Sequence, residues 1–147
     1  MKTIKILFAL LLAMGPCMAA DTNSGIGPKG GKLLENSAPR AEFFIEPDNR
    51  ITITFYDANL KPVPLAGQTV MISAAPRSGK VNVELEKKDG ALISKQPLPK
   101  RGFFDEYQIT VQIKSSPESK PEIFQVRFDL DVCKKCKHPE YTCNCPR

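Results

Sequence analysis

Residues 50–56 read Arg-Ile-Thr-Ile-Thr-Phe-Tyr and alternate cleanly between two kinds of side chain. Ile51, Ile53 and Phe55 would lie on one side of an extended chain, with the remaining four side chains on the other. A period of two residues is typical of a β-strand that packs one face on a core and turns the other to solvent. The stretch therefore predicts a half-buried strand.

Similar alternation recurs through residues 32–132, where turn residues separate the segments. Further strands are predicted at 42–46, 69–75, 81–86, 91–94, 107–113 and 123–132. In the last of these, Phe124, Val126, Phe128 and Leu130 are predicted to point inward, and Gln125, Arg127 and Asp129 outward. About seven short strands predict an all-β fold, an immunoglobulin-like antiparallel β-sandwich, with a small β-barrel as the alternative.

Residues 1–20 have the three parts of a secretory signal peptide. A positive start is followed by an unbroken apolar run over residues 6–14 and then by small residues. The run is shorter than the roughly 20 apolar residues that span a bilayer. Cleavage after Ala19 or after Ala20 agrees with the pattern about equally well. We therefore expect export to the periplasm, and Pro16 directly before Cys17 disfavours a lipoprotein.

The charge of the chain is unevenly distributed. Residues 21–132 contain fifteen Lys and Arg and fifteen Asp and Glu, whereas the tail, residues 133–147, has a formal charge of +3. The folded body therefore lacks the excess of basic residues that a nucleic-acid-binding domain carries. No further apolar stretch approaches membrane length, so we expect no transmembrane segment in the mature protein. Residues 21–31, rich in Gly, Asn and Ser, are predicted to be a flexible segment.

Catalytic patterns are absent from the predicted β-domain. The single histidine, His138, lies in the tail, outside the body that would hold a general base in place. Pairs of carboxylates such as Asp129 and Asp131 fall on a predicted strand, where solvated charges are common. We expect that the protein is not an enzyme.

The tail holds four thiols and one imidazole within thirteen residues: Cys133, Cys136, His138, Cys143 and Cys145. Their spacing is C-x-x-C, six residues, then C-x-C. A C-x-x-C turn lets two thiolates reach one ion, and four sulfurs, or three with the imidazole, complete the tetrahedral sphere of Zn²⁺. Thiolates also select Cu(I). The tail therefore predicts a site for Zn²⁺ or Cu(I).

Two disulfides are the alternative, because export leads to an oxidising compartment and four is an even number of cysteines. The C-x-C pair would close a very small strained ring, whereas Cys133–Cys143 with Cys136–Cys145 is sterically plausible. A redox-active dithiol is a third possibility. The core is expected to come from residues before Cys133. That cysteine would be held by the last strand, with Cys143 and Cys145 on a mobile arm.

Two parts of the chain resemble a group of small exported bacterial proteins. The first is residues 27–34, Gly-Pro-Lys-Gly-Gly-Lys-Leu-Leu, followed by Ala-Glu-Phe-Phe at 41–44 and by residues 56–63. A similar pattern occurs in periplasmic components of heavy-metal efflux pumps of the resistance-nodulation-division type. The second part is the tail, which is similar to the C-x-x-C-K-x-x-E-Y-x-C-x-C ending of the same small proteins.

This resemblance implies a periplasmic protein of a Gram-negative bacterium that acts in metal handling or efflux, with metal-efflux components as partners. Lys29 stands where many relatives carry a histidine. The other function that we consider is a non-catalytic periplasmic binding or assembly module, whose tail is held by two disulfides.

Overall fold

The computed structural model describes residues 25–34, 39–100 and 106–145, so the predicted signal peptide lies outside the described residues. Ten strands and one 3-10 turn are present in the described part of the chain. The strands are β1 (Lys32–Leu34), β2 (Arg40–Ile45), β3 (Ile51–Tyr56), β4 (Pro62–Val63), β5 (Thr69–Ala75), β6 (Val81–Val83), β7 (Leu85–Lys88), β8 (Ala91–Ser94), β9 (Tyr107–Lys114) and β10 (Glu122–Phe128). The turn η1 (Glu140–Thr142) belongs to the tail.

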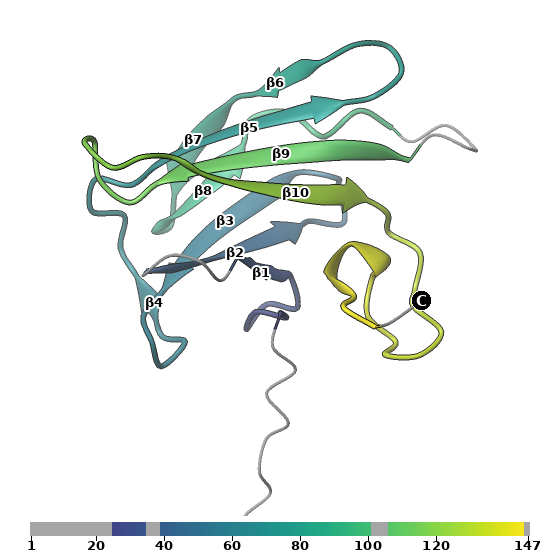
Figure 1. The fold of residues 1–147 in the computed structure, drawn as a ribbon, viewed down its shortest axis with the longest axis horizontal. Helices are drawn as coiled ribbons and strands as arrows, with labels where there is room; N and C mark the ends of the chain where they lie inside the picture. Colours follow the sequence, from purple (N-terminus) through teal and green to yellow (C-terminus); the bar gives the residue numbers. More distant parts are fainter. Residues whose placement is uncertain (1–24, 35–38, 101–105, 146–147) are drawn as a thin grey trace, which may run out of the picture.

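The strands form two antiparallel sheets that face each other (Figure 1). One sheet has the order β1-β2-β3-β8-β7, with β4 paired to β3, and the other has the order β10-β9-β5-β6. Neither sheet closes on itself within the described residues, which excludes the barrel alternative. The predicted β-sandwich is confirmed.

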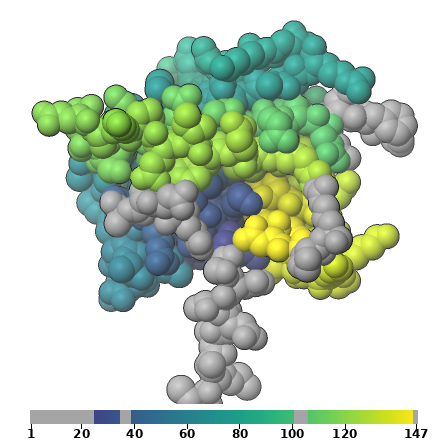
Figure 2. All heavy atoms as spheres, in the orientation of Figure 1, coloured from purple at the N-terminus to yellow at the C-terminus, as the bar shows by residue number. Residues whose placement is uncertain are grey.

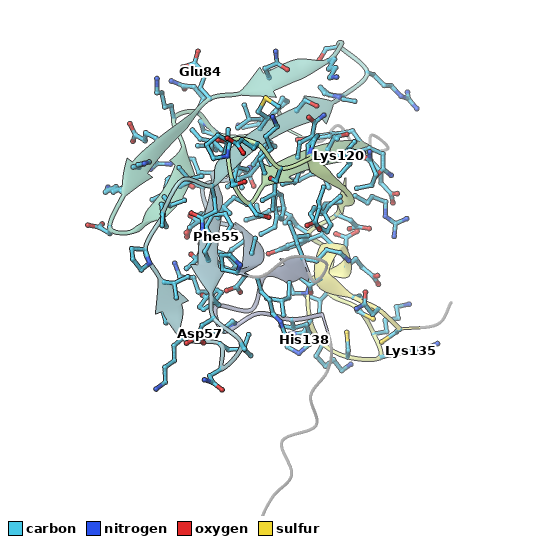
Figure 3. All side chains as sticks on the ribbon, turned by 60° about the vertical axis from the view of Figure 1, so that its left-hand side comes forward. Phe55, Asp57, Glu84, Lys120, Lys135 and His138 are labelled. Carbon is cyan, nitrogen blue, oxygen red and sulfur yellow. The ribbon has the colours of Figure 1, made fainter. Side chains whose placement is uncertain are left out.

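Strand β3 lies in the middle of the first sheet and is buried on both faces. Ile51, Ile53 and Phe55 point into the core, as predicted, and Figure 3 shows Phe55 between the sheets. Thr52, Thr54 and Tyr56, which were predicted to face solvent, are also buried. For Tyr56 the prediction was wrong because its hydroxyl donates a hydrogen bond to Glu42 beside the N-terminal loop. The Thr52 hydroxyl donates to the Glu46 carboxylate on the same face, at 2.8 Å.

The predicted strand at 81–86 is two strands in different sheets. β6 pairs with β5 in the second sheet, and β7 pairs with β8 in the first, so the chain crosses between the sheets at Glu84. The alternation runs through this crossing because Val83 and Leu85 both pack against the same core. Periodicity therefore indicated which side chains point inward but did not indicate the change of sheet.

The end of the last strand also differs from the prediction. β10 stops at Phe128, and beyond it Asp129 is 6% exposed whereas Leu130 is 41% exposed, the reverse of the predicted orientation. The chain leaves the sheet here because it turns into the tail. The carbonyls of Asp129 and Asp131 accept hydrogen bonds from the N–H groups of Tyr141 and Glu140, at 3.0 and 2.8 Å.

A buried carboxylate holds the N-terminal loop, residues 25–31, on the first sheet. Glu42 is fully buried, and its carboxylate accepts hydrogen bonds from the backbone N–H groups of Lys29 and Gly31, at 2.9 and 2.8 Å. The Tyr56 hydroxyl donates a third, at 2.7 Å. Hydrogen bonds of this kind offset the cost of burying a charge. Residues 25–31, expected to be flexible, thus pack on β2.

Two glycines permit this close approach. A Cβ atom at Gly27 would lie 2.3 Å from the Glu42 Cδ, and one at Gly31 would lie 2.5 Å from the carbonyl oxygen of Phe43. A larger residue at either position would push the loop away from the carboxylate. Gly27 and Gly31 of the Gly-Pro-x-Gly-Gly pattern are therefore explained by the packing of backbone around Glu42, and Gly30 by its φ of 87°, in the left-handed region.

Replacement of Phe128 by Ala should destabilise the sandwich by about 3–5 kcal/mol, since it removes a large core side chain. Phe128 is 2% exposed and its ring stacks on Tyr107 with a centroid separation of 4.8 Å. The matched control is Ile123→Ala on the same strand, where the side chain is 60% exposed and the expected change is below about 0.5 kcal/mol. Denaturant unfolding measures both, and equal effects would contradict the assigned inner face of β10.

Candidate metal centre

The tail is packed on the sandwich through Tyr141. This side chain belongs to the hydrophobic core cluster, and its ring meets that of Phe43 edge to face at a centroid separation of 6.2 Å. Its hydroxyl oxygen accepts a hydrogen bond from the backbone N–H of Ile45, at 3.2 Å. The expectation that the core ends before Cys133 was therefore wrong.

The same anchor corrects the expectation of a mobile arm. η1 contacts both β1 and β10, the edge strands of the two sheets. Figure 2 shows the tail in yellow, directly against the purple and blue N-terminal strands. Cys143 follows η1 without an intervening residue and is therefore held by the packed part of the tail. The side chain that ties down this segment is aromatic, so the cysteine pattern alone could not reveal it.

The first cysteine pair lies on a tight turn between two short antiparallel segments. Val132 pairs with Pro139, the Cys133 N–H donates to the carbonyl of His138 at 2.8 Å, and the Lys137 N–H donates to the carbonyl of Cys133 at 2.9 Å. Lys137 closes the turn with a φ of 64°, in the left-handed region. This geometry brings Cys136 back beside Cys133.

The second pair is positioned by η1. The Thr142 N–H and hydroxyl both donate to the carbonyl of Pro139, at 2.9 and 2.8 Å, and the Cys143 N–H donates to the carbonyl of Glu140 at 3.1 Å. The N–H of Cys145 then donates to the sulfur of Cys143 at 3.3 Å. The C-x-C segment thus folds over the first pair.

All four sulfurs converge on one point. The Sγ atoms of Cys133, Cys136, Cys143 and Cys145 lie within 4.8 Å of one another, and all four are free thiols. Cys143 Sγ is 3.2 Å from that of Cys133 and 3.6 Å from that of Cys136. A tetrahedral Zn²⁺ with bonds of about 2.3 Å would separate its sulfurs by about 3.8 Å. The cluster could therefore hold a metal ion after small adjustments.

His138 does not join this cluster. Among the described residues, the four cysteines alone form a group of His, Cys, Asp or Glu side chains whose ligand atoms converge in this way. The backbone carbonyl of His138 instead accepts the hydrogen bond from the Cys133 N–H that closes the first turn. Figure 3 labels His138 and Lys135 on the tail, where Lys135 lies at the end far from the sheets.

The four thiols are electrostatically unequal. Backbone N–H groups of Cys136 and Lys135, together with the thiol of Cys143, lower the pKa of Cys133 to about 7. For Cys143, the N–H of Cys145 lowers the pKa, but donation to the Cys133 sulfur and burial outweigh it and raise the pKa to about 12. For Cys145, the hydrogen bond with Cys143 lowers the pKa, but burial and the neighbouring sulfurs outweigh it and raise the pKa. Cys133 is therefore the first of these three thiols to ionise.

A lysine from the first sheet faces this cluster. Burial lowers the pKa of Lys32, while the charge of Cys143 acts in the opposite direction. Both residues line one hollow, whose other walls come from β9, β10 and η1. Thus Lys32 supplies positive charge beside Cys143. A residue so far from the cysteines in the sequence could be placed here only by the tertiary structure.

A cavity of about 590 Å³ lies on the outer side of the cluster. Cys133, Cys143 and Cys145 line it together with charged side chains from the tail, from β10, from the segment that joins β10 to the tail, and from Glu106 beside β9. These three cysteines therefore border a space that a small molecule can enter, although the tail is packed on the sandwich.

Comparisons with sequence models of protein families, with curated proteins and with solved structures gave no match. No helix in the described part of the chain has the length and apolar character required to cross a membrane.

Replacing Tyr141 by Phe should lower the free energy of unfolding by about 1–3 kcal/mol, because the buried N–H of Ile45 loses its acceptor. Denaturant unfolding of the reduced, metal-free protein measures this change without any contribution from an ion. Lys134→Ala, an exposed position in the same tail, is the control and should change stability by less than about 0.5 kcal/mol. A Phe variant as stable as the wild type would contradict the docking of the tail.

Proposed function

We propose that the protein is an exported, non-catalytic metal-binding protein, which binds one Zn²⁺ through Cys133, Cys136, Cys143 and Cys145. The convergence of four sulfurs within 4.8 Å of one another carries this proposal. A tetrahedral set of four thiolates suits Zn²⁺, which imposes no other geometry of its own. Cu(I), which thiolates also select, is the second ion to be tested.

The arrangement of the sulfurs favours an ion over two structural disulfides. A pair of disulfides joins sulfurs two by two, whereas Cys143 has two close sulfur neighbours, Cys133 and Cys136. Four ligands of one ion surround a single point, so each lies close to the other three. Backbone N–H groups directed at Cys133 also stabilise its thiolate, the form that binds metal.

A role in metal handling is supported by the surroundings of the cluster. The tail is held rigidly on two edge strands, while the cavity leaves the sulfurs accessible from one side. A site held in this way can keep an ion and still exchange it with another ligand. The resemblance of the chain to small exported proteins, and to components of metal-efflux pumps, supports the periplasm as its location and efflux components as its partners.

Metal titration tests this proposal. The reduced protein should bind one equivalent of Zn²⁺, and Co²⁺ in its place should give the strong ultraviolet thiolate-to-metal absorption of a sulfur site. The variant Cys133→Ser/Cys143→Ser should lose both signals. His138→Gln is the matched control and should keep them, since His138 lies outside the cluster. Binding that survives the double replacement would place the metal elsewhere.

Mass spectrometry of protein taken from the periplasm distinguishes a metal-handling protein from a passive binding or assembly module held by two disulfides. Two disulfides would make the protein roughly four mass units lighter than the free-thiol form. The metal-handling proposal requires free thiols, with Zn²⁺ retained under native conditions. Isolation of only the doubly bridged form would favour the passive binding or assembly module.

Zinc affinity should fall as the pH is lowered. Near neutral pH, Cys143, with a pKa of about 12, and Cys145, whose pKa is also raised, are protonated, and Cys133, with a pKa of about 7, is partly ionised. Zn²⁺ must displace these protons, so more than two should be released per ion, and affinity should drop about 100-fold or more per pH unit. Calorimetry in buffers of different ionisation enthalpy counts the protons. An affinity that does not vary between about pH 6 and about pH 8 would contradict a thiolate site, because ordinary thiols are mostly protonated in this range and must lose protons to bind the ion.

A further inference from the structure

Two sulfurs at the heart of the cluster differ in their access to solvent. Cys133 is 5% exposed, whereas Cys143 is partly exposed. Both border the cavity on the outer side of the cluster, as does Cys145. A molecule that enters this cavity can therefore reach Cys143 or Cys145 more easily than Cys133.

The distances between the sulfurs determine which cysteine attacks second. Cys143 Sγ lies 3.2 Å from Cys133 Sγ, closer than the 3.6 Å that separates it from Cys136 Sγ. Once Cys143 is joined to an external sulfur, Cys133 lies nearer to it than Cys136 does and can displace that external sulfur without a change of fold. Pairing within C-x-C would instead leave Cys143 and Cys145 in a very small strained ring.

We infer that the cluster is a redox-controlled metal site, in which a low-molecular-weight disulfide expels the ion by forming Cys133–Cys143 first and Cys136–Cys145 second. The expulsion of metal rests on the proposed function. The order of bridge formation rests on the sulfur positions and on access through the cavity.

The chemistry is thiol–disulfide exchange. The Cys143 thiol gives up its proton and attacks a disulfide RSSR in the cavity, which forms a mixed disulfide on Cys143, and the released RS⁻ takes up a proton as RSH. The Cys133 thiolate then attacks the Cys143 sulfur, forms the Cys133–Cys143 bond and releases the second RS⁻. The two cysteines lose two electrons in total, and RSSR gains them. The ion loses two of its four ligands and dissociates, and a second RSSR oxidises Cys136 and Cys145 in the same way.

The order of the bridges can be read from a tryptic digest. Cleavage after Lys134, Lys135 and Lys137 separates Cys133, Cys136 and the Cys143–Cys145 pair into three peptides. Zinc-loaded protein with Cys17→Ser would be treated with oxidised glutathione, while a chelating dye reports free Zn²⁺. Zinc release should coincide with the joining of peptide 128–134 to peptide 138–147, with the bond at Cys143 located by fragmentation.

Matched variants with one pair each test the geometry directly. In the same background, Cys136→Ser/Cys145→Ser keeps the 3.2 Å pair, and Cys133→Ser/Cys145→Ser keeps the 3.6 Å pair. The first should form its bridge at least about tenfold faster, because its attacking sulfur is already in place. Equal rates would overturn the inference, as would a first bridge at Cys133–Cys136 or Cys143–Cys145.

Failure of this inference is distinguishable from failure of the proposed function. Tight zinc binding by the reduced protein, with zinc retained after glutathione has formed the bridges, would overturn redox control and leave the metal site standing. Bridges that form in the inferred order in a protein that does not bind zinc would overturn the metal site and, with it, the redox control of metal.

Discussion

The docking of Tyr141 against β2 is the interaction on which the cysteine cluster depends. The hydroxyl oxygen accepts the N–H of Ile45, and the ring packs against Phe43, so a tail residue becomes part of the sandwich core. Cys143 lies two positions further along the chain, so the docking of Tyr141 also fixes the position of Cys143. The first pair is held independently by the turn at the end of β10. The two halves of the cluster therefore meet because two separate anchors are rigid.

The N-terminal loop is attached to the same sheet by a different kind of contact. Glu42 is a buried carboxylate surrounded by backbone donors and by the Tyr56 hydroxyl, and glycines at positions 27 and 31 let the backbone reach it. The loop also approaches the tail, since a Cβ atom at Gly25 would overlap the side chain of Asn144. Asn144 lies between two of the cluster cysteines. The N-terminal loop and the tail thus pack beside one another on the sandwich.

The cluster combines rigidity with access. Four thiolates around one ion would concentrate negative charge, which backbone N–H groups and Lys32 would partly offset. The cavity keeps one side open. A site that is fixed by its surroundings but open on one side can exchange an ion, or form disulfides with a small molecule as the oxidant, without unfolding the domain. This is the physical basis for regarding metal binding and disulfide formation as competing states of the same sulfurs.

By itself, the sequence determined the two-layer β architecture and the presence of a thiol-rich tail, because strand periodicity and cysteine spacing are local properties. Only the tertiary structure decided the sheet change at Glu84, the burial of Asp129 in place of Leu130, and the role of Glu42. It also decided that the tail is docked and that His138 lies outside the cluster. These features depend on contacts between distant residues. The pattern of a single segment does not encode what packs on its second face.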